Sequence, residues 1–255
     1  MAYGITIKQQ RNYAFQQNKV KSRFIAAISH EFRSPLNAIL GFAQLLEYDE
    51  ELDRNQQDSV KEITHAAEHL LILIDQTLDL AAIEADKLEL TFEDIKIIDT
   101  IKQCTNLLSS MAKQKNISFC VDIPEDLSLK ADPLRLKQIV LNFITNAIKY
   151  NPTNGSIWIK AYKIAARVRV TVIDEGPGLP AKDHSKLFDP FTRVTNHTEA
   201  IEGAGLGLSI AKSLAEEMNG QLGVANNSSK GMRFWVDLPA ASHIDKEKTL
   251  NFRFK

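Results

Sequence analysis

His30 has the chemical character and the setting of a nucleophile. It lies two residues from both Ile28 and Phe32, which is about 200° around a helix from each at 3.6 residues per turn. A helix that buries those two residues therefore presents the imidazole to solvent. Much of an unperturbed imidazole is uncharged near neutral pH, and the adjacent Glu31 carboxylate could fix its tautomer and accept the proton released on attack. A solvated surface histidine without chemistry is the alternative interpretation of this pair taken alone.

Pro35 follows His30 inside a helical pattern. The apolar or seam-compatible positions alternate in spacing between three and four, as is typical of a helix in a bundle: Ile25, Ile28, Phe32, Pro35, Ile39, Phe42 and Leu46. A proline in a helix interior removes one backbone hydrogen bond and bends the helix at a cost of about 3 kcal/mol. We therefore expect a bend about one turn after His30.

A second group of polar side chains lies on one face of an apolar helix. Asp132 and Pro133 are the predicted N-cap and first residue, and LRLKQIVLNFITNAIKY continues the helix. Asn142 and Asn146 are four residues apart and Lys149 is three further on, so the three share a face. One asparagine could simply cap a neighbour. Two amides and a lysine together favour the lining of a ligand site.

Asp174 follows a β-rich stretch and precedes Glu175, Gly176, Pro177 and Gly178. An aspartate in this place can accept a hydrogen bond from an exocyclic amine, while the glycines let the backbone pass close to a flat ring. The same residues are also ordinary turn formers. The DxGxG pattern alone therefore leaves a plain turn open.

The stretch 203–208 (GAGLGL) opens a predicted helix. Backbone N–H groups freed by glycine would face the same way as the helix N-terminus, an arrangement that suits phosphate groups. GxGxG before a helix and not after a strand fits neither a dinucleotide-binding fingerprint nor a P-loop. The polar stretch 194–202 comes just before these glycines, and we interpret it as a lid. It follows 187–193 (LFDPFTR).

Together and in this order, these motifs resemble the catalytic core of sensor histidine kinases of two-component systems. The family's motifs lie at 29–36 (H-box), 132–150 (N-box), 174–178 (G1 box), 188–191 (F-box) and 203–208 (G2 box). The resemblance extends over residues 24–239. It implies a dimerisation and phosphotransfer hairpin followed by an ATP-binding α/β sandwich of the Bergerat type, which these kinases share with type II topoisomerases.

The resemblance also implies roles for individual residues. His30 would be the phosphoacceptor and Glu31 its general base, Asn142 and Asn146 would hold Mg²⁺, and Asp174 would bind adenine. Further ATP contacts are expected from Lys149, Tyr150, Gly176, Gly178, Phe188, Phe191, Arg193, Gly203, Gly205, Leu206, Gly207 and Leu208. The implied cofactors are ATP and Mg²⁺. The implied partners are a second copy of the chain and an aspartate of a response-regulator receiver domain.

Two departures from the family pattern affect these expectations, and Asn142 bears on the choice between transfer and hydrolysis. Ser34 stands where the family commonly has Thr or Asn, a position tied to dephosphorylating the partner, so the resemblance supports a phosphatase activity less firmly. The last glycine box is reduced to residues 229–232 (SKGM). Asn142 stands in the region where a hydrolytic relative would carry a carboxylate, and an amide is no general base, which favours transfer over hydrolysis. A catalytically silent dimeric scaffold and a plain ATPase remain the alternative functions.

Two long helices must position His30. Residues 8–23 predict a polar helix that continues into the His30 helix, 49–55 (DEELDRN) predict a turn, and a return helix is expected from about Gln56 to Asp86. Two such helices cannot bury their broad apolar stripes alone, so we expect a homodimeric four-helix bundle. His65 and His69 on the return helix could form half a metal site, but without an HExxH motif a solvated helix surface is the preferred interpretation.

The other elements are expected between residues 88 and 239. The helices are predicted at 97–116, 133–150 and from the G2 glycines to about 219, and the strands or extended segments at 88–95, 117–123, 127–130, 156–164, 167–173, 221–225 and 232–238. The fold class is thus α followed by α/β, a helical hairpin and then a mixed sheet packed on helices. The expected domains are 1–22 (signalling helix), 23–88 (dimerisation and phosphotransfer), 89–240 (ATP binding) and 241–255 (tail).

The composition agrees with a globular protein that does not bind nucleic acid. The 255 residues are 44% hydrophobic and 25% charged, with a net charge of −1, and we see no long basic block. Cys104 and Cys120 have no metal-binding spacing, which favours a reduced, cytoplasmic setting. No stretch reaches the ~20 apolar residues of a membrane span, and no signal-peptide core is present. The parent could still be a membrane-bound sensor with an upstream segment.

Overall fold

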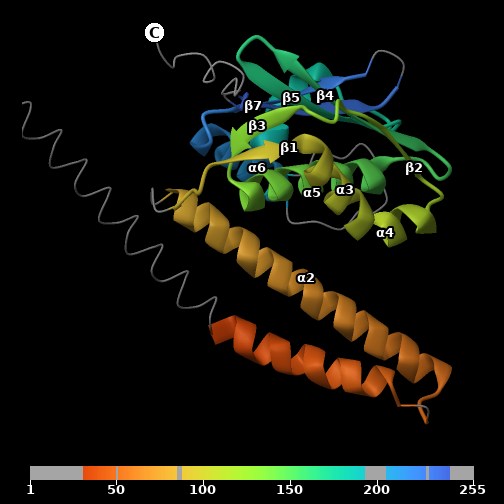
Figure 1. Ribbon diagram of the computed structural model, residues 1–255. Coiled ribbons are helices and arrows are strands. Elements are labelled where there is room, and N and C mark those ends of the chain that lie inside the picture. Colours follow the sequence, from red (N-terminus) through yellow and green to blue (C-terminus); the bar gives the residue numbers. More distant parts are fainter. Residues whose placement is uncertain (1–30, 50, 85–87, 193–204, 228–229, 242–255) are drawn as a thin grey trace, which may run out of the picture. The chain divides into compact units, whose positions relative to one another are not determined.

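The structure is a computed structural model that describes residues 31–49, 51–84, 88–192, 205–227 and 230–241. It divides into two compact units, Met1–Glu89 and Leu90–Lys255 (Figure 1). The first unit is a helical hairpin, and the second is a mixed sheet packed on helices. The predicted fold class is therefore confirmed.

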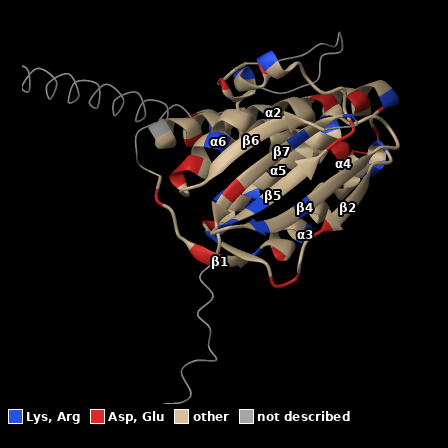
Figure 2. Ribbon diagram, turned by 90° about the horizontal axis from the view of Figure 1, so that it is seen from above, with Lys and Arg blue, Asp and Glu red and all other residues tan. Residues whose placement is uncertain are grey.

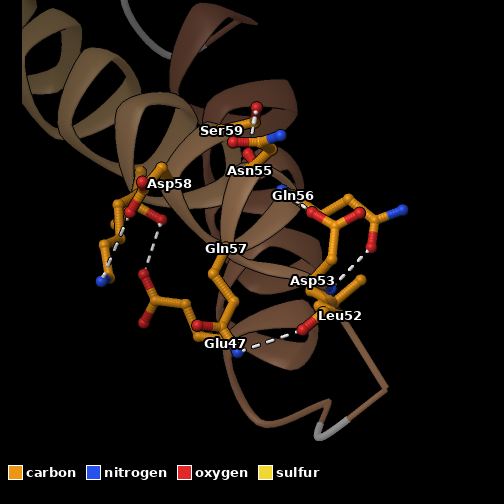
Figure 3. A network of polar contacts seen from close by, with 10 residues as sticks. Glu47, Leu52, Asp53, Asn55, Gln56, Gln57, Asp58 and Ser59 are labelled. Carbon is orange, nitrogen blue, oxygen red and sulfur yellow. Dashed lines mark hydrogen bonds and ion pairs between the residues drawn. The ribbon is translucent and has the colours of Figure 1, made fainter.

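The hairpin consists of a helix that includes residues 31–47 and the antiparallel helix α2 (Arg54–Glu84). Asp53 caps α2 through reciprocal bonds, because Gln56 N donates to Asp53 Oδ1 and Asp53 N donates to Gln56 Oε1, both at 2.9 Å (Figure 3). This capping box starts α2 two residues earlier than predicted. The spacing Asp53-x-x-Gln56 was the signal in the sequence.

The first helix of the hairpin packs on α2 through a different stripe from the seam predicted for it. Leu36, 7% exposed, packs with Ala67 and Ile74, and Leu40, Leu71 and Leu78 adjoin this cluster. The described residues of the predicted seam of the first helix are exposed instead, with Phe42 at 69%; the others are Phe32, Pro35, Ile39 and Leu46. The first helix therefore carries two apolar stripes, and the chain covers one of them itself.

The second unit contains a five-stranded sheet in the order β2-β4-β5-β7-β6. The strands are β2 (Ser118–Asp122), β4 (Ser156–Ile164), β5 (Arg167–Ile173), β6 (Gln221–Asn226) and β7 (Met232–Pro239). The β2–β4 pair is parallel and the other pairs are antiparallel (Figure 2). A smaller antiparallel pair joins β1 (Glu93–Lys96) to β3 (Ser128–Ala131).

Helices cover one face of the five-stranded sheet (Figure 1). They are α3 (Ile97–Leu107), α4 (Ser109–Gln114), α5 (Pro133–Tyr150) and α6 (Gly207–Glu217). The core lies between α5 and the sheet, where Phe143 and Phe234 have ring centroids 5.8 Å apart. Alternate residues of β4 (Ile157, Ile159, Ala161) and of β5 (Val168, Val170, Val172) are buried, as expected for strands with one covered face, and Thr171 of β5 is buried as well.

The single helix predicted for 97–116 is wrong, because the structure interrupts it at Leu108. The Ser109 hydroxyl donates to the carbonyl of Asn106 at 2.8 Å. Serine side chains offer the backbone such alternatives to helical bonding. The result is two shorter helices, α3 and α4.

Candidate functional site

The described part of the first helix includes Glu31 and Ser34, and both are exposed. His30, Arg193 and Gly203 lie outside the described residues. Residues 31–47 are helical throughout, so Pro35 does not end the helix, and the bend stays a prediction. His65 on α2 is exposed, in keeping with a solvated helix surface.

Asp174 lies directly after β5 and is 2% exposed. Its Oδ1 accepts hydrogen bonds from Gly176 N at 2.8 Å and Met232 N at 3.0 Å. The other carboxylate oxygen, Oδ2, takes part in neither bond. Burial raises the pKa of this carboxyl, and the backbone hydrogen bonds from Met232 and Gly176 oppose that rise without cancelling it.

Two glycines let the backbone pass close to Asp174. A Cβ at Gly176 would lie 2.9 Å from the carbonyl oxygen of Tyr150, and a Cβ at Gly231 would lie 1.9 Å from the carbonyl oxygen of Asp174. Gly231 also has φ +91°, which disfavours other residues. The G1 stretch is therefore pressed between the end of α5 and the start of β7.

Two asparagines that the sequence analysis did not single out bind the backbone around Asp174. Asn226 holds Leu179 at both ends, accepting from Leu179 N at 3.1 Å and donating to Leu179 O at 2.8 Å. Asn151 accepts a bond from Glu175 N at 2.7 Å. Their signal in the sequence was weak, because each is a single asparagine at the end of an element.

Asn142 and Asn146 are in contact on α5, where Asn146 Nδ2 donates to Asn142 Oδ1 at 3.0 Å. A Cβ at Gly207 would lie 2.6 Å from Asn142 Nδ2, so α6 begins directly beside this amide. Within the described residues, no group of three or more His, Cys, Asp or Glu side chains could hold a metal ion. The amide oxygens of Asn142 and Asn146 are hard ligands of the kind that Mg²⁺ accepts.

The start of α6 has no side-chain cap for its first backbone N–H groups, and Leu206 at the N-cap position is buried. Gly205 has φ +71°, and a Cβ there would lie 2.8 Å from Thr192 O. Gly207 and Leu208 form the first turn. An uncapped, glycine-opened helix start is suited to an anion.

The remaining predicted residues surround these groups. Tyr150 is exposed and Lys149 half-buried at the end of α5, and Phe188 lies 5.6 Å from Lys212 Nζ of α6 in a cation–π contact. Phe191 is exposed. Gly178 has φ +70° and adjoins Asn226. The N-box thus adjoins the G2 box where Asn142 lies beside Gly207. It adjoins the G1 box where Tyr150 lies beside Gly176.

Two family models match the chain. Residues 20–86 match the His Kinase A (phospho-acceptor) domain. Residues 131–242 match the histidine kinase-, DNA gyrase B- and HSP90-like ATPase family. The two matches together extend over more than half of the chain.

Known proteins resemble the chain over most of its length. Sensor protein GacS of Pseudomonas syringae pv. syringae is 37% identical over 257 residues, covering 97% of this chain and 28% of GacS. The structure of full-length ShkA in complex with AMPPNP has a TM-score of 0.72 at 34% identity, covering 86% of this chain and 46% of ShkA. Histidine kinase ThkA in complex with response regulator protein TrrA has a TM-score of 0.60 at 26% identity, covering 86% of this chain and 61% of that one. The chain therefore spans about a quarter of GacS and less than half of ShkA.

Among the described residues, no helix has the length and apolar character needed to cross a membrane.

Proposed function

The chain belongs to the sensor histidine kinases of two-component systems, and on this premise we propose that it phosphorylates itself on His30 from ATP. It then passes the phosphoryl group to an aspartate of a response-regulator receiver domain. The observation that carries the proposal is that one chain contains both a phospho-acceptor domain and an ATPase-type domain. One part matches a phospho-acceptor domain around His30 and Glu31, and the other holds a buried carboxylate, Asp174, within an ATPase-type fold.

The nucleotide would bind between α5, the G1 stretch and the start of α6. Asp174 Oδ2 would accept a hydrogen bond from the exocyclic amine of adenine, because Oδ1 is already occupied by two backbone donors. The first turn of α6 would face the phosphates. Asn142 and Asn146 would hold Mg²⁺ through amide oxygens, and the ion would neutralise phosphate charge.

Phosphoryl transfer forms a bond between one imidazole nitrogen of His30 and the γ-phosphorus, and it breaks the bond from that phosphorus to the bridging oxygen of ADP. The proton leaves from the other ring nitrogen, and the Glu31 carboxylate accepts it. Glu31 is exposed on the first helix, so its carboxylate is accessible for this role.

The hairpin would supply both partner surfaces. The exposed apolar row of Phe32, Ile39, Phe42 and Leu46 would be covered by a second copy of the chain, giving a homodimeric four-helix bundle. The receiver domain would dock near His30, because the phosphoryl group has to pass from that side chain to its aspartate; the neighbour ThkA forms a complex with response regulator protein TrrA. Ser34 would take part in dephosphorylating the receiver domain. We place the phosphoryl transfer, which depends on ATP, in the cytoplasm.

The test is incubation of the full chain with γ-labelled ATP and Mg²⁺. Label that is lost in acid and kept in base identifies a phosphohistidine. His30→Gln should abolish this label, whereas His65→Gln, which changes an exposed histidine of α2, should retain it.

The alternative functions give other results. A plain ATPase would release phosphate without labelling the protein, and a silent scaffold would do neither. Label that persists in His30→Gln would overturn the assignment of the phosphoacceptor.

A further inference from the structure

We propose that Asn151 is a positioning residue that fixes the adenine end of the nucleotide site relative to its metal end. This inference rests on the proposed function and deepens it. The two ends belong to different elements, since Asn142 and Asn146 lie on α5, whereas Asp174 follows β5. A group that ties those elements together sets the distance between them.

Asn151 lies at the C-terminal end of α5 and is hydrogen-bonded to it. It is the C-cap residue of that helix, and its backbone N–H donates to Ala147 O at 3.0 Å. Its side chain is buried, with the residue 4% exposed. A group that is hydrogen-bonded to this amide is therefore held in a defined position relative to α5. It is thereby also positioned relative to Asn142 and Asn146, which lie on the same helix.

The side chain of Asn151 reaches the residue after the adenine acceptor. Its Oδ1 accepts from Glu175 N at 2.7 Å, and its Nδ2 donates to Ser156 O at 3.1 Å. Glu175 Oε2 in turn accepts from Ser156 N at 2.7 Å. These bonds join the end of α5, the start of β4 and the G1 stretch, and the one to Glu175 acts on the residue next to Asp174.

Loss of the Asn151 side-chain amide would remove the hydrogen bond that ties Glu175 of the G1 stretch to the end of α5. Asp174 would still be held by Met232 at the start of β7, so the carboxylate would stay buried while its alignment with the base became less strict. The expected consequence is weaker discrimination between bases. A purely structural role would lower the melting temperature and leave that discrimination unchanged.

The experiment measures equilibrium binding of ATP and ITP to the full chain by calorimetry. ITP carries a carbonyl oxygen in place of the exocyclic amine, so the wild type should prefer ATP. Asn151→Leu should reduce the ATP-to-ITP preference about 5- to 10-fold, the equivalent of one hydrogen bond of about 1 kcal/mol. Asn151→Thr, whose side chain is too short for both bonds, serves if the leucine variant does not fold.

Lys115→Met is the matched control. Lys115 Nζ donates to the carbonyls of Ile148 and Lys149 at 3.1 and 2.7 Å, so this residue stabilises the same helix end without a side-chain bond to Glu175. The control should lower the melting temperature and keep the ATP-to-ITP preference.

A folded Asn151→Leu or Asn151→Thr with the wild-type preference overturns the inference, as does an equal loss in Lys115→Met. Absence of ATP binding by the wild type would overturn the proposed function and this inference with it, so the two failures are distinguishable.

Discussion

Asp174→Asn should weaken ATP binding by a specific route that the geometry of the carboxylate dictates. The side-chain oxygen at the Oδ1 position accepts from Gly176 N and Met232 N, and the amide oxygen of asparagine would have to remain there. Turning the amide over would set its NH₂ group against two N–H donors. The NH₂ group must therefore occupy the Oδ2 position, where it would face the exocyclic amine of adenine, donor against donor.

The size of the effect follows from the bond that is lost. A hydrogen bond to a charged group is worth about 1.5–3 kcal/mol, so the dissociation constant for ATP should rise about 10- to 100-fold. ITP offers an acceptor to the new NH₂ group, so its affinity should hold or increase. The base preference of the site should therefore reverse or vanish.

The same substitution should not unfold the protein. Burial raises the pKa of Asp174, so above that raised pKa the ionised carboxylate lowers the free energy of unfolding, and a neutral amide removes this cost. The melting temperature at pH 7 should therefore equal or exceed that of the wild type. Calorimetric titration with both nucleotides, together with thermal unfolding, provides the measurement. Unchanged ATP affinity, or an equal loss for ATP and ITP, would refute the reasoning.

Four further outcomes are expected at the same sites. Glu31→Gln should slow incorporation of γ-label about 10²- to 10⁴-fold through loss of the general base, while Glu62→Gln on the exposed surface of α2 should not. Ser34→Ala should spare that incorporation and slow the loss of label from a phosphorylated receiver domain; a loss of autophosphorylation as severe as that of Glu31→Gln would contradict this division of roles. Asn146→Asp should abolish labelling by changing the charge at Mg²⁺, with nucleotide affinity in EDTA kept within about tenfold, and normal labelling would count against the metal assignment. ATP affinity should fall on acidification at a pH above that expected of an ordinary aspartate, because the raised pKa of Asp174 means earlier protonation, and Asp174→Asn should lack this component.

Local chemistry made much of the second unit predictable. Asp132 and Pro133 predicted the start of α5, and the structure has Asp132 Oδ1 accepting from the backbone N–H groups of Leu134 and Arg135. The bounds of β4 and β5 agree with those predicted, because their β-branched and apolar residues end at turns. These signals lie within a few residues of each other, so no knowledge of the fold is needed to use them.

The hairpin packing was not predictable in the same way. The first helix has one apolar stripe through Phe42 and another through Leu36, and both have the spacing of a seam. Which stripe meets α2 depends on the rotation of two helices about their axes, and a single sequence does not record that rotation. The contact of Asp174 with Met232 is similar, since 58 residues separate them and strand register must be known to bring them together.

With the adenine-binding role proposed for Asp174, its hydrogen bond from the start of β7 would make nucleotide binding a late event in folding. Gly176 can bond to the carboxylate as soon as its own turn forms, but Met232 reaches it through the pairing of β7 with β5, a contact of long sequence separation that forms slowly. A chain emerging from the ribosome would thus expose His30, the α5 amides and the G1 glycines well before it could hold ATP. ATP should therefore protect nascent chains from proteolysis only once residues 232–239 have left the ribosome and can pair with β5. ATP binding would then require the completed sheet.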